Sequence, residues 1–173
     1  MSDEHERGFG RGWHQGAFVA MLIAIFFMAV AISQVSPIRQ TAGRLAKISL
    51  ADQEFNLEIA DTPYQQRQGL SGRPSIPDDG GMLFLFSPPR QVVFWMKDMR
   101  FPIDIIWVRD KTIVGYVSLA MPPEPGMPDD LIQRFSSPEP VDGVVEIRAG
   151  RASELGLEIG QAVQIQLPLK IRL

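Results

Sequence analysis

The chain contains no cysteine, and its two histidines, His5 and His14, both lie near the amino terminus. The absence of cysteine excludes disulfides, thiolate metal sites, iron–sulfur clusters and cysteine catalysis. The position of the histidines excludes a Ser-His-Asp triad and a histidine-ligated zinc site from the region after residue 14. Basic residues are too few for a nucleic-acid-binding protein, because 17 Lys and Arg against 20 Asp and Glu leave a net charge of −3.

Charge is also missing from one long segment. No charged residue occurs between Arg11 and Arg39, and residues 17–35 are apolar except for Ser33 and Gln34. As a helix rising about 1.5 Å per residue, this segment would be about 28 Å long, close to the roughly 30 Å hydrocarbon core of a bilayer. A helix of a soluble domain is expected to show a polar stripe, and this segment has none. The sequence therefore predicts that residues 17–35 enter or cross a membrane.

Two interpretations of residues 17–35 stay open. The segment could be a signal peptide cleaved near Ala31, since Ala29-Val30-Ala31 resembles a peptidase site and Arg7 and Arg11 form a basic start. It could instead be an uncleaved anchor. We favour the anchor, because the apolar stretch is long for a signal peptide and acidic residues occur in the tail before it.

Either interpretation gives the same domain organisation. Residues 1–16 form a polar tail, 17–35 the anchor or signal segment, 36–44 a linker and 45–173 a separate domain. A short polar start followed by an apolar run usually leads an exported domain. We therefore expect a single-pass protein of the cell membrane whose carboxy-terminal domain is extracytoplasmic (periplasmic or extracellular), or a secreted protein if the leader is removed.

The region after residue 45 shows the period-two alternation that is typical of β-strands. Leu45–Ala51 and Glu54–Ala60 predict a hairpin, and Thr62-Pro63-Tyr64-Gln65 carries the cap, proline and glutamine of a short helix. Further strands are expected at Met82–Phe86, Val92–Met96, Ile103–Val108, Thr112–Leu119, Val144–Ile147 and Ala162–Leu167, with a second short helix at Ala149–Leu155. The predicted fold class is mostly β (α+β): a small closed or partly open β-barrel with two short helices, preceded by one N-terminal transmembrane or signal helix.

Proline interrupts this pattern twice. Pro88-Pro89 is expected to end the strand that begins at Met82. Residues 120–140 hold Pro122, Pro123, Pro125, Pro128, Pro138 and Pro140, which argue against any central strand or helix there. A loop of this length in a compact domain is often functional.

Several segments together resemble a bacterial and archaeal family, Domain of Unknown Function 192. The matching segments are Thr62-Pro63, Arg67-Gln68-Gly69-Leu70 with Arg73, Gly81–Phe86, Phe94-Trp95-Met96-Lys97, Pro102–Ile106, Ser137-Pro138, Val144–Ile147, Ala149-Gly150 and Gly156–Gly160. The resemblance covers about residues 46–167 and implies a small, mostly β fold that is often exported or tethered to a membrane. It implies no established activity. The chain departs from the usual pattern at Asp98-Met99, at Gln161 and at Phe135-Ser136.

Charged side chains inside apolar stretches mark a candidate ligand site. Asp104, Lys97 and Glu146 each lie among apolar neighbours, where a charge is costly unless it is paired or hydrated. Arg67 and Arg73 flank the first predicted helix. The hypothesis is a single pocket, with Trp95 at its wall, that holds a small anionic or amphipathic ligand. The proposed binding residues are Arg67, Arg73, Trp95, Lys97, Asp104 and Glu146; the alternative is a set of structural ion pairs on exposed strand faces.

Two other function classes stay open. A hydrolase-like enzyme could use the carboxylates of Asp104 and Glu146 if both faced one cleft. A structural or assembly factor at the membrane surface would instead expose an apolar patch around Pro122–Phe135. The methionines outside the apolar segment are best explained as core filling, so we expect no metal site and no cofactor. Whether the chain is an enzyme is left open, with a ligand- or partner-binding module favoured.

Overall fold

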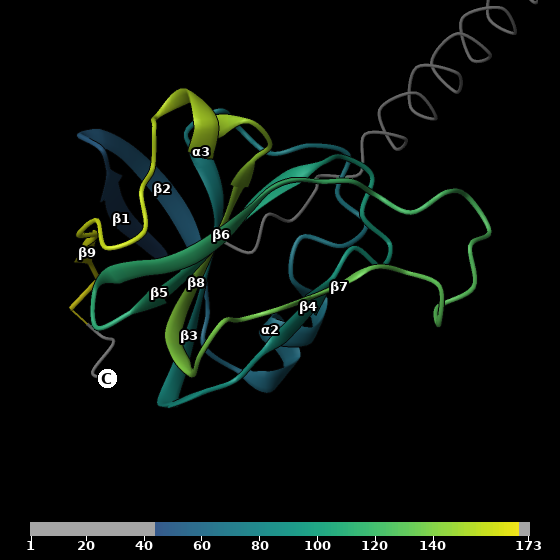
Figure 1. Cartoon of the computed structure of the whole chain (residues 1–173), viewed down its shortest axis with the longest axis horizontal. Helices are drawn as coiled ribbons and strands as arrows, with labels where there is room; N and C mark the ends of the chain where they lie inside the picture. Colours follow the sequence, from purple (N-terminus) through teal and green to yellow (C-terminus); the bar gives the residue numbers. More distant parts are fainter. Residues whose placement is uncertain (1–43, 170–173) are drawn as a thin grey trace, which may run out of the picture. The chain divides into compact units, whose positions relative to one another are not determined.

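A computed structural model describes residues 44–169, which form a mostly β domain with two short helices, as the sequence predicted (Figure 1). The helices are α2 (Pro63–Gln68) and α3 (Arg151–Glu154). The strands are β1 (Leu45–Leu50), β2 (Gln53–Ala60), β3 (Gly80–Arg90), β4 (Val93–Trp95), β5 (Ile103–Arg109), β6 (Thr112–Ala120), β7 (Arg134–Ser136), β8 (Val141–Arg148) and β9 (Gln164–Gln166).

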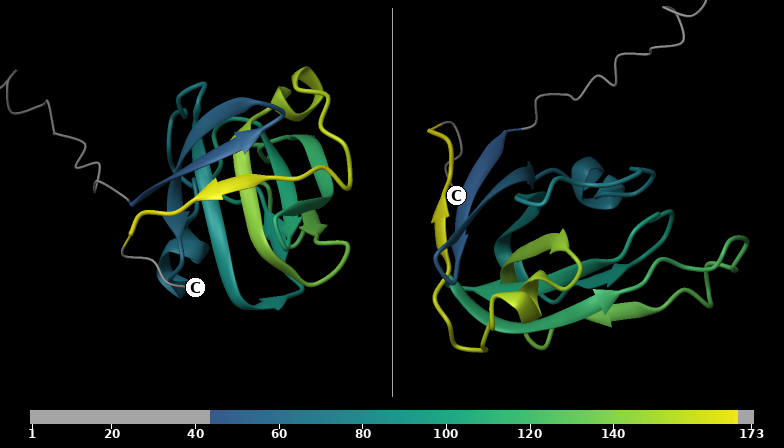
Figure 2. Two further views of the ribbon diagram at one scale, coloured as in Figure 1. Left: turned by 90° about the vertical axis from the view of Figure 1, so that its left-hand side faces the viewer. Right: turned by 90° about the horizontal axis from the view of Figure 1, so that it is seen from above.

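Seven of the strands form one sheet in the order β6-β5-β8-β3-β2-β1-β9, and β4 pairs separately with β7. All pairs in the large sheet are antiparallel except β2 with β3. The sheet curls into a half-barrel, and Figure 2 shows β1 and β9 crossing in front of the central strands. Of the two expected forms, the structure thus shows an open half-barrel and not a closed barrel.

The two edges of the curled sheet meet at one corner. The amide of Ile113 donates to the carbonyl of Gln161 at 2.9 Å, and the amide of Val163 donates to the carbonyl of Lys111 at 2.8 Å. These bonds join the start of β6 to the segment that leads into β9. The corner holds the curl in place without making a continuous barrel.

Two hydrophobic cores lie on opposite faces of the central strands. The inner core, inside the curl, includes Leu57, Leu83 and Ile147 together with α3. The outer core includes Phe84, Ile105 and the loop that follows α2. Residues of β3 therefore alternate between two buried faces, which explains why Met82–Phe86 is an uninterrupted apolar run.

Gly81 is required where β3 meets β8. Its φ of 154° lies outside the range that side chains favour, and an added Cβ would lie 2.0 Å from the carbonyl oxygen of Glu146. A side chain there would force β3 and β8 apart. These strands carry Glu146 and contribute residues to both cores.

Local sequence sets the first helix, whereas a distant residue caps the second. Thr62 and Gln65 form the predicted capping box, Pro63 opens α2, and Gly69 ends it with φ 49°. Gly150 precedes α3 and has no side chain to cap it. Asp104 on β5 supplies that cap, as described below.

One of the two predictions about proline is wrong. β3 runs through Pro88-Pro89 to Arg90, because its pairing with β8 shifts register between Leu85 and Arg90 and requires no amide from either proline. The prediction for the proline-rich stretch is confirmed within residues 44–169, because its one short strand, β7, pairs with β4 alone and is not a central strand. The prediction of a membrane segment at 17–35 lies outside the described residues. Within residues 44–169, no helix is long and apolar enough to cross a bilayer.

Candidate functional site

A surface groove of about 710 Å³ lies between α2, the end of β3 and β4. We call it the α2–β4 groove. Its walls come from α2 on one side and from Gln91–Phe94 on the other, and Phe84 and Phe86 contribute aromatic surface. A cavity of this size fits a small organic ligand or a short stretch of peptide. The lining residues are Asp61, Pro63, Gln66, Arg67, Phe84, Leu85, Phe86, Ser87, Pro88, Arg90, Gln91, Val92, Val93 and Phe94.

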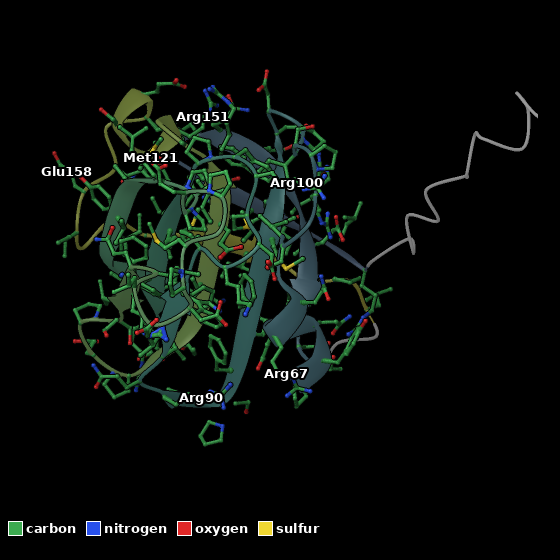
Figure 3. The ribbon with its side chains drawn as sticks, turned by 90° about the vertical axis from the view of Figure 1, so that its right-hand side faces the viewer. Arg67, Arg90, Arg100, Met121, Arg151 and Glu158 are labelled. Carbon is green, nitrogen blue, oxygen red and sulfur yellow. The ribbon has the colours of Figure 1, made fainter. Side chains whose placement is uncertain are left out.

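Two arginines give the groove its charge. Arg67 and Arg90 both line it, and Figure 3 shows them at the same end of the domain, away from Arg100 and Arg151. Neither forms an ion pair with any residue between 44 and 169. The one carboxylate of the groove, Asp61, is already held by both oxygens against Arg44 at 2.5 Å. The groove therefore presents two guanidinium groups whose charge no carboxylate balances.

Gln66 fixes the position of Arg90. The Gln66 side-chain nitrogen donates to the carbonyl of Leu85 at 2.8 Å, which ties α2 to β3. Its oxygen accepts a hydrogen bond of 3.0 Å from Arg90, whose guanidinium also lies 4.8 Å from the centre of the Phe86 ring. Arg90 is thus oriented by an amide and an aromatic face while its positive charge stays unbalanced.

Below the groove, three aromatic rings pack edge-to-face. Phe94 contacts Phe84 edge-on, with ring centres 4.8 Å apart, and contacts Trp107 with ring centres 5.5 Å apart. Such pairs resist rearrangement because their rings are buried in the outer core. The groove therefore combines a rigid apolar base with two cations, a combination that suits an amphipathic anion.

A second cavity, also about 710 Å³, lies between the β4–β5 loop and the proline-rich segment. Lys97, a predicted site residue, lines it and is paired with Asp129. Arg100 also lines it, but Asp98 and Glu124 add further carboxylates. Acidic groups outnumber basic ones here, so this cavity is a poorer site for an anion than the α2–β4 groove.

Trp95 lies beside Lys97, as the sequence suggested, but on an exposed ribbon. It is 41% exposed, with the Lys97 nitrogen 5.3 Å and the Arg134 guanidinium 4.9 Å from its ring. The two cations cover the indole from β7 and from the loop after β4. Trp95 therefore contributes to a cation–π cluster at the surface and lines neither cavity.

Asp104 is completely buried and fully hydrogen-bonded to backbone. One oxygen accepts from the amides of Leu119 at 2.9 Å and Gly150 at 3.0 Å, and the other accepts from Ala152 at 2.7 Å. These bonds supply the cap that Gly150 cannot provide and hold α3 against β5 and β6. The carboxylate has a structural explanation and lies in neither cavity.

Glu146 lies on the opposite face of the sheet from Asp104. Register pairs Glu146 with Ile105 in the outer core, whereas Asp104 pairs with Ile147 in the inner core. Partners directly across strands share a face, so the two carboxylates point in opposite directions. They do not face one cleft, which is the arrangement that the hydrolase hypothesis required.

Arg73 connects Glu146 to a second acid. Glu58, Met82 and Glu146 occupy one row across β2, β3 and β8, and Arg73 holds both oxygens of Glu58, one of them at 2.9 Å. Among the described residues Glu146 has no hydrogen-bond partner for its carboxyl group. Burial raises the pKa of Glu146 to about 8, and the nearby Arg73 opposes that rise. Burial therefore favours the protonated form of the Glu146 carboxyl near neutral pH.

The structure thus divides the six predicted site residues among separate places. Trp95 and Lys97 are neighbours, as are Arg73 and Glu146, while Arg67 lies in the α2–β4 groove and Asp104 under α3. The residues that sequence reasoning missed are Gln66 and Arg90. Arg90 follows two prolines that were expected to end the strand, so nothing in the sequence linked it to Arg67.

Comparison with known proteins identifies the family. The profile of the family described as "Uncharacterized ACR" (DUF192) matches residues 46–165. The chain belongs to the DUF192 family. No curated protein matches it.

Two solved structures resemble this DUF192 domain. One is a protein of unknown function from Novosphingobium aromaticivorans DSM 12444, with 29% identity and a TM-score of 0.61, covering 69% of this chain and 83% of that one. The other is a putative transcription regulator from Sinorhizobium meliloti 1021, with 30% identity and a TM-score of 0.61, covering 70% of this chain and 92% of that one. The matched region of the DUF192 family includes every residue that lines the α2–β4 groove.

Proposed function

We propose that the domain is a binding module that takes an anionic, partly apolar ligand or partner segment in the α2–β4 groove. The observation that carries this proposal is the pair of guanidinium groups, Arg67 and Arg90, whose charge no carboxylate among residues 44–169 balances. A charge-assisted hydrogen bond to a carboxylate is about twice as strong as a neutral one. The aromatic base beneath them would hold the apolar part of the same ligand.

Titration with matched small molecules tests this proposal. Benzoate and benzamide share a ring and differ in charge, so the pair isolates the effect of the anion. Calorimetry with the full chain in a mild detergent should show benzoate binding at least about tenfold more tightly than benzamide, a difference of about 1.4 kcal/mol. Equal affinities, or no benzoate binding at millimolar concentration, would contradict the proposal.

We also propose that residues 17–35 anchor the domain on the extracytoplasmic side of the cell membrane. The support is the apolar length of the segment and the absence of charge between Arg11 and Arg39. Reporters fused to the carboxyl end test it: alkaline phosphatase should be active and a cytoplasm-dependent fluorescent protein dark. The reverse pattern would overturn this placement without affecting the groove.

A second candidate function is an assembly role through the proline-rich segment. Met121 is 62% exposed and Leu131 is 68% exposed, so apolar side chains are displayed where the assembly hypothesis expected them. Photo-crosslinking from position 131, with position 159 as the exposed apolar control, distinguishes the assembly role from the ligand-binding role. A defined partner crosslinked only from position 131 would favour the assembly role, and equal labelling from both positions would count against it.

A further inference from the structure

Strand β4 borders the α2–β4 groove with an unpaired edge. β4 pairs with β7 in the register Val93 to Ser136, Phe94 to Phe135 and Trp95 to Arg134. No other strand of residues 44–169 pairs with β4. Figure 1 shows β4 between β7 and α2, and Val92, Val93 and Phe94 all line the groove. The side of β4 away from β7 therefore faces the groove.

The hydrogen bonds of the ribbon show which backbone groups of β4 are free. The amide of Ser137 donates to the carbonyl of Val92 at 2.9 Å, which makes these two residues a hydrogen-bonded pair. In an antiparallel pair, bonded and non-bonded positions alternate along the strand. Phe94 therefore turns its backbone towards β7, and Val93 and Trp95 turn their N–H and C=O groups the other way. Among the described residues, these groups have no other backbone partner.

Ser137 and Gln91 fix the register of β4 against β7. The Ser137 hydroxyl accepts from the amide of Val92 at 3.1 Å, and the Gln91 side chain donates to the carbonyl of Ser137 at 2.8 Å. The first residues of β4 are thus held in one register before any ligand arrives. A strand edge that is already ordered loses little conformational freedom when another strand pairs with it.

A small anion would use the two arginines but would leave this edge unpaired. An extended peptide would use both, because its backbone pairs with the strand while one carboxylate reaches the guanidinium groups. Three residues of such a peptide extend about 10 Å, which suits a groove of this size. One kind of occupant then pairs with the exposed edge, binds the cations and packs on the aromatic base.

We propose that the groove takes an extended peptide segment that adds as a third strand to the free edge of β4 and places a carboxylate between Arg67 and Arg90. This inference rests on the proposed function, because it names the class of ligand for the same groove. The carboxylate is either the carboxyl terminus of the peptide or an acidic side chain, and both present the same chemistry to the two arginines.

Peptides with selective backbone methylation test the strand pairing. The probe is acetyl-Thr-Val-Thr-Val with a free carboxyl end, and its N-methyl versions remove one amide donor each without changing its charge. Nitrogen–proton NMR of the full chain should show binding of the parent peptide near the amide of Val93. Methylation at alternate positions should weaken binding at least about tenfold, and methylation at the intervening positions should have little effect.

Protein variants supply the matching test from the other side. Val93→Pro removes the N–H that faces the groove, whereas Val93→Ala shortens the side chain and keeps the N–H. Proline is tolerated at the unpaired edge of a strand, and thermal unfolding of both variants checks the fold. The peptide should bind Val93→Pro at least about tenfold more weakly than Val93→Ala, and equal affinities for the two variants would contradict strand addition.

The outcomes separate this inference from the proposed function. Strand addition is overturned if benzoate binds and the peptide does not, or if the peptide binds equally well whatever the position of its methyl group. Either result leaves the anion site intact. Failure of both benzoate and the peptide overturns both proposals. With strand addition established, loss of binding on amidation of the probe shows that its terminal carboxylate is the anion that binds, and recovery of binding when an Asp is added to the amidated peptide shows that an acidic side chain can take its place.

Discussion

The two surface cavities of the domain have the same volume, about 710 Å³, and differ in how their charges are balanced. In the second cavity, Lys97 is paired with Asp129, and Asp98 and Glu124 add negative charge. In the α2–β4 groove, the single acid Asp61 is occupied by Arg44, so Arg67 and Arg90 remain unbalanced. Cavity volume therefore does not separate the two cavities, whereas the pairing of their cations does.

Removing both groove arginines should give the largest effect. Arg67→Ala together with Arg90→Ala deletes both charge partners of the ligand, and we expect benzoate affinity to fall about a hundredfold, roughly 3 kcal/mol. Arg100→Ala, in the second cavity, is the matched control and should change affinity less than about twofold. Loss of benzoate binding in the control variant, with retention in the double variant, would mean that the second cavity, and not the α2–β4 groove, binds the anion.

A buried acid should respond to pH while the groove does not. The pKa of Glu146 is raised to about 8, well above that of a glutamate in an unfolded chain. The folded state therefore binds more protons between these values, so the free energy of unfolding falls as pH rises from about 4.5 to about 8. Glu146→Gln should remove this slope and stabilise the fold by about 2 kcal/mol at neutral pH, as measured by urea unfolding.

Benzoate binding should not follow the titration of Glu146, because arginine stays charged across this range. Calorimetry near pH 6 and near pH 9 should therefore give the same affinity within about twofold. An affinity that changes along with the stability would mean that Glu146, and not the arginine pair, controls the ligand site.

A carboxylate placed beside Arg90 should make the groove resemble the second cavity. Gln66→Glu puts an acid where the amide oxygen now accepts from Arg90 at 3.0 Å. We expect benzoate affinity to fall about tenfold, and stability to fall by about 1 kcal/mol because the bond to the carbonyl of Leu85 is lost. Gln66→Met loses the bonds to Leu85 and to Arg90 without adding charge, so it should lower stability by a similar amount and reduce benzoate affinity much less than Gln66→Glu does.

The converse change in the second cavity should have the smallest effect. Asp129→Asn releases Lys97 from its ion pair while Asp98 and Glu124 remain. We expect only weak, millimolar benzoate binding to appear there, which NMR signals of Arg100 and Met127 would report. Binding as tight as in the α2–β4 groove would show that two unpaired guanidinium groups are not the deciding feature.

Sequence patterns predicted what depends on local interactions. The capping box of α2 and the strand at Met82–Phe86 follow from neighbouring residues, and both are confirmed. The family assignment is also confirmed. These features need no knowledge of which distant segments meet.

The candidate site depends on distant pairings that one sequence does not encode locally. Arg67 and Arg90 line one groove because Gln66 bonds to β3 and β3 continues past two prolines. Asp104 lies outside both cavities, and its carboxylate accepts hydrogen bonds from amides more than 40 positions away in the sequence. The sequence placed Asp104 and Glu146 among apolar neighbours and suggested one shared pocket, but the strand register shows that they occupy opposite faces.

NMR of the arginine Nε–Hε groups during a benzoate titration tests the central claim most directly. The account predicts that the signals of Arg67 and Arg90 move together and saturate with one affinity, while those of Arg100 and Arg134 stay fixed. Saturable shifts at Arg100, or a titration that moves none of the four signals, would contradict an anion site in the α2–β4 groove.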